Sequence, residues 1–165
     1  MRIITLRPVN INDSDFMLLL VNAPGVSRFL PGIISDKSMM KAWIESLDDM
    51  DHEYIIEVAD TETAIGECSL SIRGKTAEVG LMILPEYWNQ GFGSETIRKL
   101  LGIAQMLEIE TAIATTDKNN RAMISILEKN GFSFNKVGWM LKINEDDEND
   151  LSGAQTVVEY RKVLK

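Results

Sequence analysis

The pattern of apolar residues changes its period in the middle of the chain, between residues 77 and 107. Residues 79–84 (V-G-L-M-I-L) are apolar at nearly every position, so a strand formed there would have no polar face. Such a segment is typical of a strand buried on both faces, and Pro85 predicts its end because proline cannot donate to a sheet. From Ser94 onward, apolar side chains recur at the spacing of one helix face: Ile97, Leu100, Leu101, Ala104 and Leu107. We therefore predict a buried strand, a glycine-containing loop and a helix, in this order.

The residues before this region predict two helices followed by antiparallel strands. Asparagine and aspartate precede the first helix, and Ser35 or Asp36 precedes the second, where these side chains can cap the helix. A loop at residues 22–32, rich in proline and glycine, connects the two helices. The predicted strands are residues 2–9, 54–59 and 64–72, the helices are 16–21 and 36–47, and the turns are 48–53, 60–63 and 73–75.

The residues after the central helix predict a strand, a helix and two more strands. Residues 111–116 (T-A-I-A-T-T) are the first of these strands, and it pairs in parallel because a helix separates it from the central strand. Asn119 or Asn120 caps the next helix, which ends at Gly131. The whole chain, residues 1–165, is thus predicted to be one α/β domain with a mixed, mostly antiparallel sheet. The last predicted strands are 132–143 and 156–164, joined by an acidic loop at 144–153.

Gly91 and Gly93 lie in the short loop that connects the central strand to its helix. Glycine lets a backbone approach a ligand closely, and the first N–H groups of a helix have no partner within it. Together with the positive end of the helix dipole, this arrangement suits a phosphate group. Similar loops also occur where nothing binds, so the two glycines alone leave both a phosphate site and a simple turn open.

Charge and composition restrict the kinds of partner. The chain carries a net charge of −8, which argues against an extended nucleic-acid surface and favours either cationic substrates or solubility alone. Its longest apolar run, residues 16–21, is too short to cross a bilayer, and the N-terminus lacks a signal-peptide pattern. We therefore expect a cytoplasmic protein with no nucleic-acid or membrane partner, either a monomer or a homodimer paired through its last strand.

His52 and Cys68 are the single histidine and the single cysteine of the chain. His52 lies in the polar segment 48–53 and is predicted to be a solvated turn residue, whereas Cys68 lies in a strand and is predicted to be buried. One residue of each kind excludes a disulfide within the chain and argues against a Cys/His zinc site. Neither a metal nor a histidine-dependent nucleophile is therefore expected.

Two segments together resemble the GNAT N-acetyltransferases. Residues 83–94 (I-L-P-E-Y-W-N-Q-G-F-G-S) resemble the loop that binds the pyrophosphate of acetyl-CoA in this family. Residues 120–132 (N-R-A-M-I-S-I-L-E-K-N-G-F) resemble its second signature, in which an asparagine starts a helix and a glycine-phenylalanine pair ends it. The segments L-R-P-V-N-I-N-D-S-D at 6–15 and W-N-Q-G-F-G-S-E at 88–95 are similar to the Rim-type branch, which acetylates the N-termini of ribosomal proteins.

The resemblance implies a splayed sheet with helices on both faces, and acetyl-CoA as cosubstrate. In the family, the fourth and fifth strands separate, and the pantetheine arm lies along the edge of the fourth. This places Met82, Ile83 and Leu84 beside the thioester, with the Ile83 amide as donor to the developing oxyanion. Asn120 matches the residue that contacts the pantetheine arm. The backbone N–H groups that would hold the pyrophosphate are those of Asn89, Gln90, Gly91, Phe92, Gly93 and Ser94.

Three positions depart from the family pattern. Trp88 stands where arginine or glutamine usually opens the loop, and Gln90 is the alternative source of a polar contact. Met123 replaces a serine or alanine, and Leu127 replaces a tyrosine that acts as general acid in many members. These departures leave two rival interpretations open: a non-catalytic acyl-CoA-binding or regulatory domain, and an unrelated α/β domain whose glycine loop is only a turn.

The predicted reaction is direct transfer of acetyl from the thioester to a primary amine, on a protein N-terminus or a small molecule. Glu78 on the central strand is the first candidate for the carboxylate that accepts the amine proton, and Glu67 on the neighbouring strand is the second. A thiolate is a tolerable leaving group, and Ser125 or Tyr87 is the candidate that protonates it. The candidate contacts to the acceptor, between the loops 22–32 and 144–153, are Arg28 and Phe29.

Overall fold

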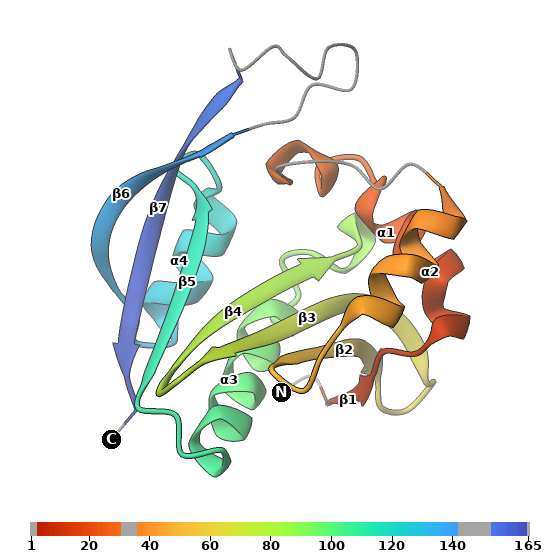
Figure 1. The fold of residues 1–165 in the computed structure, drawn as a ribbon, viewed down its shortest axis with the longest axis horizontal. Helices are drawn as coiled ribbons and strands as arrows, with labels where there is room; N and C mark the ends of the chain where they lie inside the picture. Colours follow the sequence, from red (N-terminus) through yellow and green to blue (C-terminus); the bar gives the residue numbers. More distant parts are fainter. Residues whose placement is uncertain (1–2, 31–35, 142–152, 165) are drawn as a thin grey trace.

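In the computed structural model, which describes residues 3–30, 36–141 and 153–164, the chain forms one sheet with helices on both faces (Figure 1). The strand order is β1-β2-β3-β4-β5-β7-β6, and all neighbours are antiparallel except β4 and β5. The strands are β1 (Ile4–Pro8), β2 (Asp51–Val58), β3 (Thr63–Arg73), β4 (Thr76–Ile83), β5 (Thr111–Asp117), β6 (Ser133–Leu141) and β7 (Ala154–Val163). The helices are η1 (Ile11–Asp13), α1 (Ser14–Val21), η2 (Ser27–Phe29), α2 (Lys37–Ser46), η3 (Pro85–Tyr87), α3 (Phe92–Met106) and α4 (Arg121–Lys129).

The strands β4 and β5 pair at one end only. Residues Thr76–Glu78 of β4 pair in parallel with Thr111–Ile113 of β5, and no pairing continues beyond Glu78 in the described residues. Figure 1 shows the two strands diverging from this point, so that β5, β7 and β6 form one arm and β1 to β4 the other. The mixed, mostly antiparallel, splayed sheet predicted from the sequence is thereby confirmed.

The helices α3 and α4 cover one face of the sheet and bury its larger core. Ile97 and Leu100 of α3 and Leu127 of α4 are fully buried there. They pack with apolar residues of β3 and β4, of which Leu70 and Val79 are examples. Burial of one Leu or Ile side chain stabilises the fold by about 1.5–3 kcal/mol, so this face holds the domain together.

The helices α1 and α2 cover part of the opposite face. Met17 and Val21 of α1, Met40 of α2 and Ile55 of β2 form a smaller buried cluster there. Trp43 of α2 is only half-buried against this cluster. This smaller cover leaves polar residues of β3 and β4 partly exposed on the same face, which matters for the site described below.

Two predictions about individual strands were wrong. β2 begins at Asp51 rather than 54, and His52 is a half-buried strand residue opposite Leu70, not a turn residue. Residues 51–53 pair with Ser69–Ser71 of β3, and this pairing overcomes the preference of such polar residues for a turn. β4 is not buried on both faces: residues 80–82 are half-buried, because β5 has moved away and α1 and α2 cover this stretch only in part.

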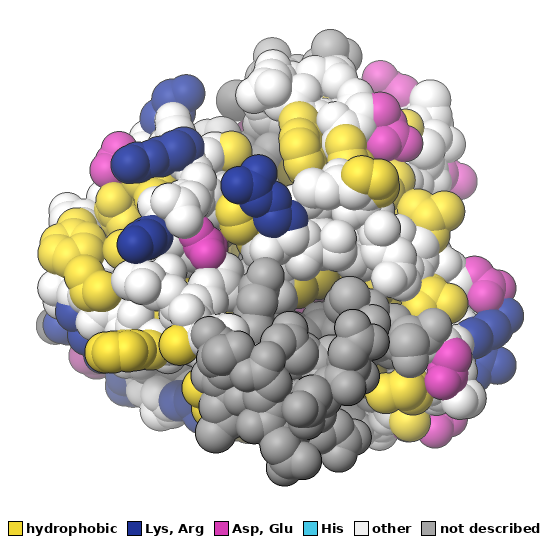
Figure 2. All heavy atoms as spheres, turned by 90° about the horizontal axis from the view of Figure 1, so that it is seen from above, with side chains coloured by type: hydrophobic (Ala, Val, Ile, Leu, Met, Phe, Trp, Pro, Cys, Tyr) yellow, Lys and Arg dark blue, Asp and Glu magenta, His cyan; other side chains and the backbone are white. Residues whose placement is uncertain are grey.

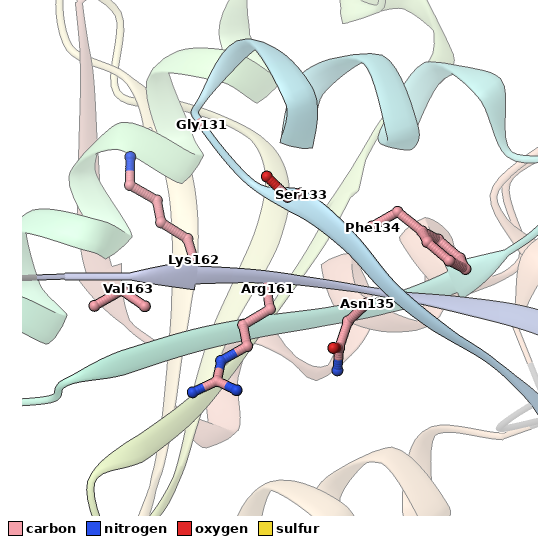
Figure 3. Close-up of a pocket in the computed structure, with 7 residues that line it drawn as sticks. All are labelled: Gly131, Ser133, Phe134, Asn135, Arg161, Lys162 and Val163. Atoms are coloured by element: carbon pink, nitrogen blue, oxygen red, sulfur yellow. The ribbon is translucent and has the colours of Figure 1, made fainter.

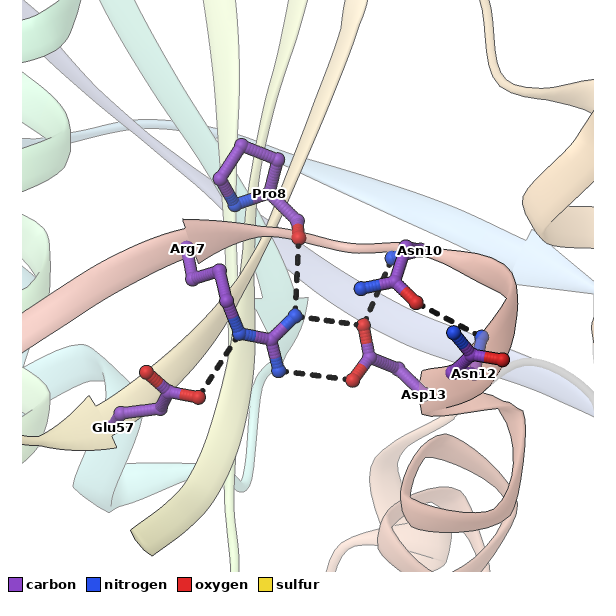
Figure 4. Close-up of polar contacts among 6 residues, drawn as sticks. All are labelled: Arg7, Pro8, Asn10, Asn12, Asp13 and Glu57. Atoms are coloured by element: carbon purple, nitrogen blue, oxygen red, sulfur yellow. Dashed lines mark hydrogen bonds and ion pairs between the residues drawn. The ribbon is translucent and has the colours of Figure 1, made fainter. Parts of the chain in front are cut away.

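Arg7 joins the first strand to the first helical turn (Figure 4). Its guanidinium donates two hydrogen bonds of 2.9 Å to the carboxylate of Asp13, and its Nε donates to Glu57 Oε1 at 3.0 Å. Asp13 also accepts the backbone N–H of Asn10 at 2.8 Å. Burial alone would raise the pKa of Asp13, but the hydrogen bonds from Arg7 and Asn10 outweigh it and lower the pKa.

Replacement Arg7→Met is expected to lower the free energy of unfolding by about 1 kcal/mol at pH 7, since the pair is partly exposed. The folded pKa of Asp13 is below its unfolded value, so this stabilisation is present above about pH 3.9 and is lost as the pH falls further. Urea unfolding at pH 7 and pH 3 measures the difference. Equal losses at both pH values would contradict the account, and Arg73→Met, at a more exposed and longer ion pair, is the control.

None of the helices in the described part of the chain has both the length and the apolar character needed to cross a membrane.

Candidate active site

The open edge of β4 begins where the pairing with β5 ends. The N–H of Leu84 donates to the carbonyl oxygen of Ile65 on the β3 side at 2.9 Å. Successive N–H groups of a strand point to opposite sides, so the N–H of Ile83 points away from β3, toward the open edge. The register gives Ile83 no strand partner on that side among the described residues. A preoriented backbone donor therefore faces the space between β4 and β5.

Trp88 fixes the chain just after β4. Its indole Nε1 donates to the carbonyl oxygen of Ile83 at 2.6 Å. Its ring lies so close to Gly25 that a Cβ there would be 2.6 Å from Trp88 Cη2. The side chain of Gln90 is also used within the loop, because its Nε2 donates to the carbonyl oxygen of Glu86 at 2.7 Å. The departure at Trp88 thus has a structural role, and polar contacts to a phosphate are left to the backbone.

The loop between Trp88 and α3 has the conformation of an anion socket. Asn89 and Gly91 have positive φ angles of 57° and 89°, and Gly91 is the N-cap of α3 without a side-chain cap. The first N–H groups of any α-helix have no acceptor within the helix itself, and the N-cap Gly91 offers no side chain to take them up. Residues 89–91 are exposed, so a phosphate can reach them.

Gly93 in the first turn of α3 is closely packed against side chains of α4 and β4. A Cβ at this position would lie 2.7 Å from Ile126 Cδ1 of α4 and 3.3 Å from Leu81 Cδ2 of β4. Ser94 in the same turn accepts a hydrogen bond from Asn130 Nδ2 at 3.0 Å. The predicted segments 82–84 and 89–94 are thus brought to one end of the open edge, with α4 packed beside them.

The helix α4 carries the other predicted residues. Asn120 is its N-cap, with Oδ1 accepting the N–H of Met123 at 3.1 Å. Its predicted contact to the pantetheine arm stays a prediction. Leu127 is fully buried, so no polar group replaces the family tyrosine at that point. Ser125 is half-buried. Tyr87 of η3 lies edge-on to Phe92, with the ring centroids 5.9 Å apart.

Several carboxylates lie on the face that α1 and α2 partly cover. Glu78 is exposed and is the last residue of β4 that pairs with β5. Glu67 of β3 lies directly opposite Met82 of β4 and is only 4% exposed. Its carboxyl is hydrogen-bonded to that of Glu53 on β2. Sequence reasoning missed Glu53 because it assigned this residue to a turn, although the alternation in D-H-E-Y-I-I-E-V at 51–58 indicated a strand.

Burial and the neighbouring carboxyl change the acidity of this pair. Burial, and then the hydrogen bond and charge of Glu53, raise the pKa of Glu67 well above its usual value. Burial also raises the pKa of Glu53; the hydrogen bond from Glu67 opposes this rise, and the charge of Asp51 adds to it. The pKa of each carboxyl therefore lies above its usual value, and burial is the largest cause for both.

The predicted acceptor contacts are described only in part. Arg28 and Phe29 lie in η2, with the guanidinium 5.4 Å from the centroid of the Phe29 ring. Arg28 is exposed and Phe29 is half-buried. Of the opposite wall predicted at 144–153, only Gly153 lies within the described residues.

A pocket of about 360 Å³ lies elsewhere, between the start of β6 and the end of β7 (Figure 3). Its residues include none from β4 or from the loop before α3. Lys162 on its wall donates to the carbonyl oxygen of Asn130 at 2.6 Å, and Arg161 is exposed. We therefore place the candidate active site at the β4 edge and not in this pocket. The pocket between β6 and β7 is lined by Gly131, Ser133, Phe134, Asn135, Arg161, Lys162 and Val163.

Known proteins share this sequence pattern and this fold. Residues 4–133 match the family described as Acetyltransferase (GNAT) domain. The "Uncharacterized N-acetyltransferase p20" of Bacillus licheniformis is 26% identical over 145 residues, which cover 82% of this chain and 80% of that protein. An acetyltransferase (GNAT family) from Bacillus anthracis superposes with a TM-score of 0.78 at 17% identity, over 99% of this chain and 96% of that one.

A chimera of the spermidine N-acetyltransferase SpeG from Vibrio cholerae and hSSAT superposes with a TM-score of 0.76 at 17% identity, over 98% of this chain and 95% of that one. At such identities the solved structures show a common fold, while the family match covers most of the chain. GNAT acetyltransferases use acetyl-CoA and an amine acceptor. The splayed sheet, the loop before α3 and the match over residues 4–133 show that this chain belongs to the GNAT family and is an acyltransferase enzyme.

Proposed function

We propose that this protein transfers the acetyl group of acetyl-CoA directly to a primary amine. The observation that carries the proposal is the N–H of Ile83 at the open edge of β4, which has no strand partner among the described residues and lies a few residues before the exposed loop that opens α3. The amides of residues 89–94 fit the pyrophosphate of the cosubstrate. Met82, Ile83 and Leu84 would then line the thioester, and the Asn120 side chain would meet the pantetheine arm.

In the proposed reaction the amine nitrogen forms a bond to the acetyl carbonyl carbon, and the carbon–sulfur bond breaks. The Ile83 N–H stabilises the negative charge that develops on the carbonyl oxygen. An ammonium acceptor loses two protons overall: one passes to a carboxylate of the protein, and the other accompanies the thiolate. The sequence makes Glu78 the first candidate for this carboxylate, and in the structure it is exposed at the point where β4 and β5 part. Glu67 is the second candidate. Ser125 or Tyr87 is the proposed donor to the thiolate.

The distribution of charge supports a cationic acceptor. Figure 2 views the end toward which β4 runs, and there Lys and Arg side chains lie mostly over the half with β5–β7 and α4. Asp and Glu side chains lie mostly over the half with α1 and α2. An anionic cosubstrate and a cationic amine would thus meet separate halves, and the net charge of −8 favours the amine.

Two classes of acceptor fit this proposal. The Rim-type features at 6–15 and 88–95 favour a protein N-terminus, while the name of the similar SpeG chimera suggests a polyamine. Freeing an N-terminal amine at pH 7 costs about 1 kcal/mol, against roughly 4–5 kcal/mol for a lysine-type amine. Arg28 and Phe29 are the proposed acceptor contacts. A cytoplasmic location and a monomer or homodimer complete the proposal.

A second candidate function is a non-catalytic acyl-CoA-binding domain. It is favoured by Leu127, which is fully buried where many family members carry a catalytic tyrosine. Such a domain would bind coenzyme A through the same loop and transfer nothing.

The test is a transfer assay with acetyl-CoA and four acceptors: a peptide with a free N-terminus, spermidine, an N-terminally blocked lysine peptide and an amino sugar. Released thiol and N-acetylated product are measured together. Equal amounts of both with at least one acceptor are expected. Coenzyme A binding without product from any acceptor would reject the proposed transfer in favour of the second candidate.

A further inference from the structure

The carbonyl oxygen of Ile83 lies on the same open edge of β4 as the N–H of this residue. In a trans peptide unit the C=O and N–H bonds point in opposite directions. The N–H of Leu84 donates toward β3, to the carbonyl oxygen of Ile65, so the Ile83 carbonyl in the same peptide unit points away from β3. A negative and a positive end of the backbone dipoles therefore lie side by side where the acetyl group is proposed to react.

The indole of Trp88 occupies this carbonyl oxygen. Its Nε1 donates to the oxygen at 2.6 Å. The Trp88 side chain is 43% exposed and belongs to none of the three buried clusters of the described residues. The contacts that hold the indole are thus at the edge of β4 and at Gly25, and not in the hydrophobic core.

The six-membered ring of Trp88 meets the loop that follows α1. A Cβ at Gly25 would lie 2.6 Å from Trp88 Cη2 and 3.4 Å from Cζ3. The loop residues Ala23 and Val26 are buried in one cluster with Leu84, the residue after β4. The short helix η2, which carries the proposed acceptor contacts, begins two residues after Gly25. This loop is therefore seated on the edge of β4 both by the buried cluster and by the Trp88 ring.

A carbonyl oxygen without a donor at this place would oppose the proposed reaction. The oxyanion proposed to form at the Ile83 N–H would lie beside the negative end of the Ile83 carbonyl dipole, and the two would repel each other. The indole N–H places a positive partial charge on this oxygen and is oriented before the reaction begins. A water molecule can donate to the same oxygen, but it would first have to be ordered there.

We infer that Trp88 is a positioning residue for the acetyl transfer, which holds the Ile83 carbonyl and the loop after α1 in place together. Through the hydrogen bond, only the N–H of Ile83 is presented to the developing oxyanion. Through the ring contact with Gly25, the loop that would carry the amine acceptor keeps its distance from the same edge. Trp88 itself touches no reacting atom, and the inference rests on the proposed acetyl transfer.

Trp88→His and Trp88→Phe test the hydrogen bond. The five-membered ring of histidine can place an N–H where the indole has its own, phenylalanine has no donor, and both lack the ring atoms that meet Gly25. With both substrates saturating, kcat should stay within about threefold of the parent in Trp88→His and fall about tenfold in Trp88→Phe. This loss is smaller than the 10²–10³-fold typical of removing an oxyanion donor itself.

The Michaelis constants separate this role from a general loss of structure. Since both variants lose the ring contact with Gly25, KM for the amine acceptor should rise by the same factor in both. The dissociation constant of coenzyme A should stay within about threefold of the parent, because the loop before α3 is not changed. Trp139→Phe, the same replacement at an 85% exposed residue of β6, is the control and should leave all three constants unchanged.

An isosteric replacement tests the hydrogen bond even if the smaller side chains disturb the fold. In this protein the Trp88 indole is replaced by benzothiophene, in which sulfur stands in place of N–H and the ring shape is nearly the same. We expect kcat to fall about tenfold, as in Trp88→Phe. KM for the acceptor and the melting temperature should match those of the parent, because the contact with Gly25 is kept.

The seating of the loop is tested by Gly25→Ala in a double-mutant cycle with Trp88→His. The new Cβ presses on Cη2 of Trp88, and this atom is absent in Trp88→His. The backbone strain at φ 86° is present in both backgrounds, so it cancels in the cycle. Gly25→Ala should therefore raise KM for the acceptor by a larger factor in the parent than in Trp88→His.

Equal kcat values in Trp88→His and Trp88→Phe, or full kcat in the benzothiophene protein, would overturn the role of the hydrogen bond. An additive cycle would overturn the seating of the loop by the Trp88 ring. Each of these results leaves the proposed transfer standing, because the unmodified protein still turns over. Absence of turnover in the unmodified protein would overturn both the transfer and this inference.

Discussion

Replacement Ser94→Asp is expected to weaken the binding of coenzyme A about 100-fold, or about 2.7 kcal/mol, while the fold stays as stable or becomes slightly more stable. Ser94 is in the first turn of α3, which has no capping side chain. A carboxylate there meets the positive end of the helix dipole and adds about 0.3–1 kcal/mol to stability. The same charge repels a pyrophosphate held on the adjacent N–H groups. Calorimetric titration with coenzyme A measures the affinity, and thermal unfolding measures the stability.

Ser94→Asn is the matched control, because an asparagine side chain can also accept the hydrogen bond that Asn130 Nδ2 gives to Ser94. It adds no charge, so its affinity should stay within about threefold of the parent. If both variants bind coenzyme A equally well, the phosphate is not held at the first turn of α3. If both variants lose stability, the side chain of Ser94 is needed for the fold, and the expected stabilisation by a carboxylate at the start of α3 is wrong.

Replacement Gly66→Ala is expected to destabilise the fold by about 3 kcal/mol, the upper end for overpacking a buried site. Gly66 lies on β3, where a Cβ would collide with the carbonyl oxygen of Met82 and lie 3.0 Å from Ile83 Cα. Both contacts are backbone atoms, which cannot move aside as a flexible side chain can. At about 2–4 °C per kcal/mol, the melting temperature should fall by roughly 6–12 °C.

The control for this variant is Gly102→Ala in the middle of α3. A Cβ at Gly102 meets nothing within 4 Å, so the substitution should raise stability by about 1 kcal/mol through helix propensity. The two Gly→Ala changes are therefore expected to have opposite signs. A Gly66→Ala protein as stable as the parent would show that β3 and β4 are not held as closely as the structure has them.

The elements were predictable where local signals agree with the fold. The strand-to-helix change after Pro85, the capping residue Asn120 and the turn glycine Gly131 each appear in the structure at the predicted places. Each of these features is determined by residues close together in the sequence. The spacing of apolar residues distinguishes strand from helix, Asn120 caps its own helix, and glycine at 131 permits a positive φ. The positive φ of 82° at Gly131 is such a case.

The start of β2 was not predictable in the same way. Asp51, His52 and Glu53 read as a turn, and it is the pairing with β3 that makes them a strand. Pairing depends on residues some eighteen positions away, which local propensity does not contain. The same limit hid the Glu53–Glu67 pair, since its two members come together only through this register.

The site was predictable in its backbone parts and less so in its side chains. The segments 82–84 and 89–94 were placed by resemblance, and the structure brings them to one open edge. The role of Trp88 was not predictable, because its hydrogen bond to Ile83 and its packing on Gly25 join three separate segments. The proton acceptor and the acceptor contacts depend on such long-range contacts and stay predictions.

The most direct test of the account is a thermal shift with acetyl-CoA, coenzyme A and ATP side by side. A ligand at 100 times its dissociation constant stabilises the folded state by about 2.7 kcal/mol, which is roughly 5–11 °C for a chain of this size. The account predicts such a shift with both coenzyme A forms and none with ATP at the same concentration. No shift with either coenzyme A form at millimolar concentration would contradict it, and the loop before α3 would then be only a turn.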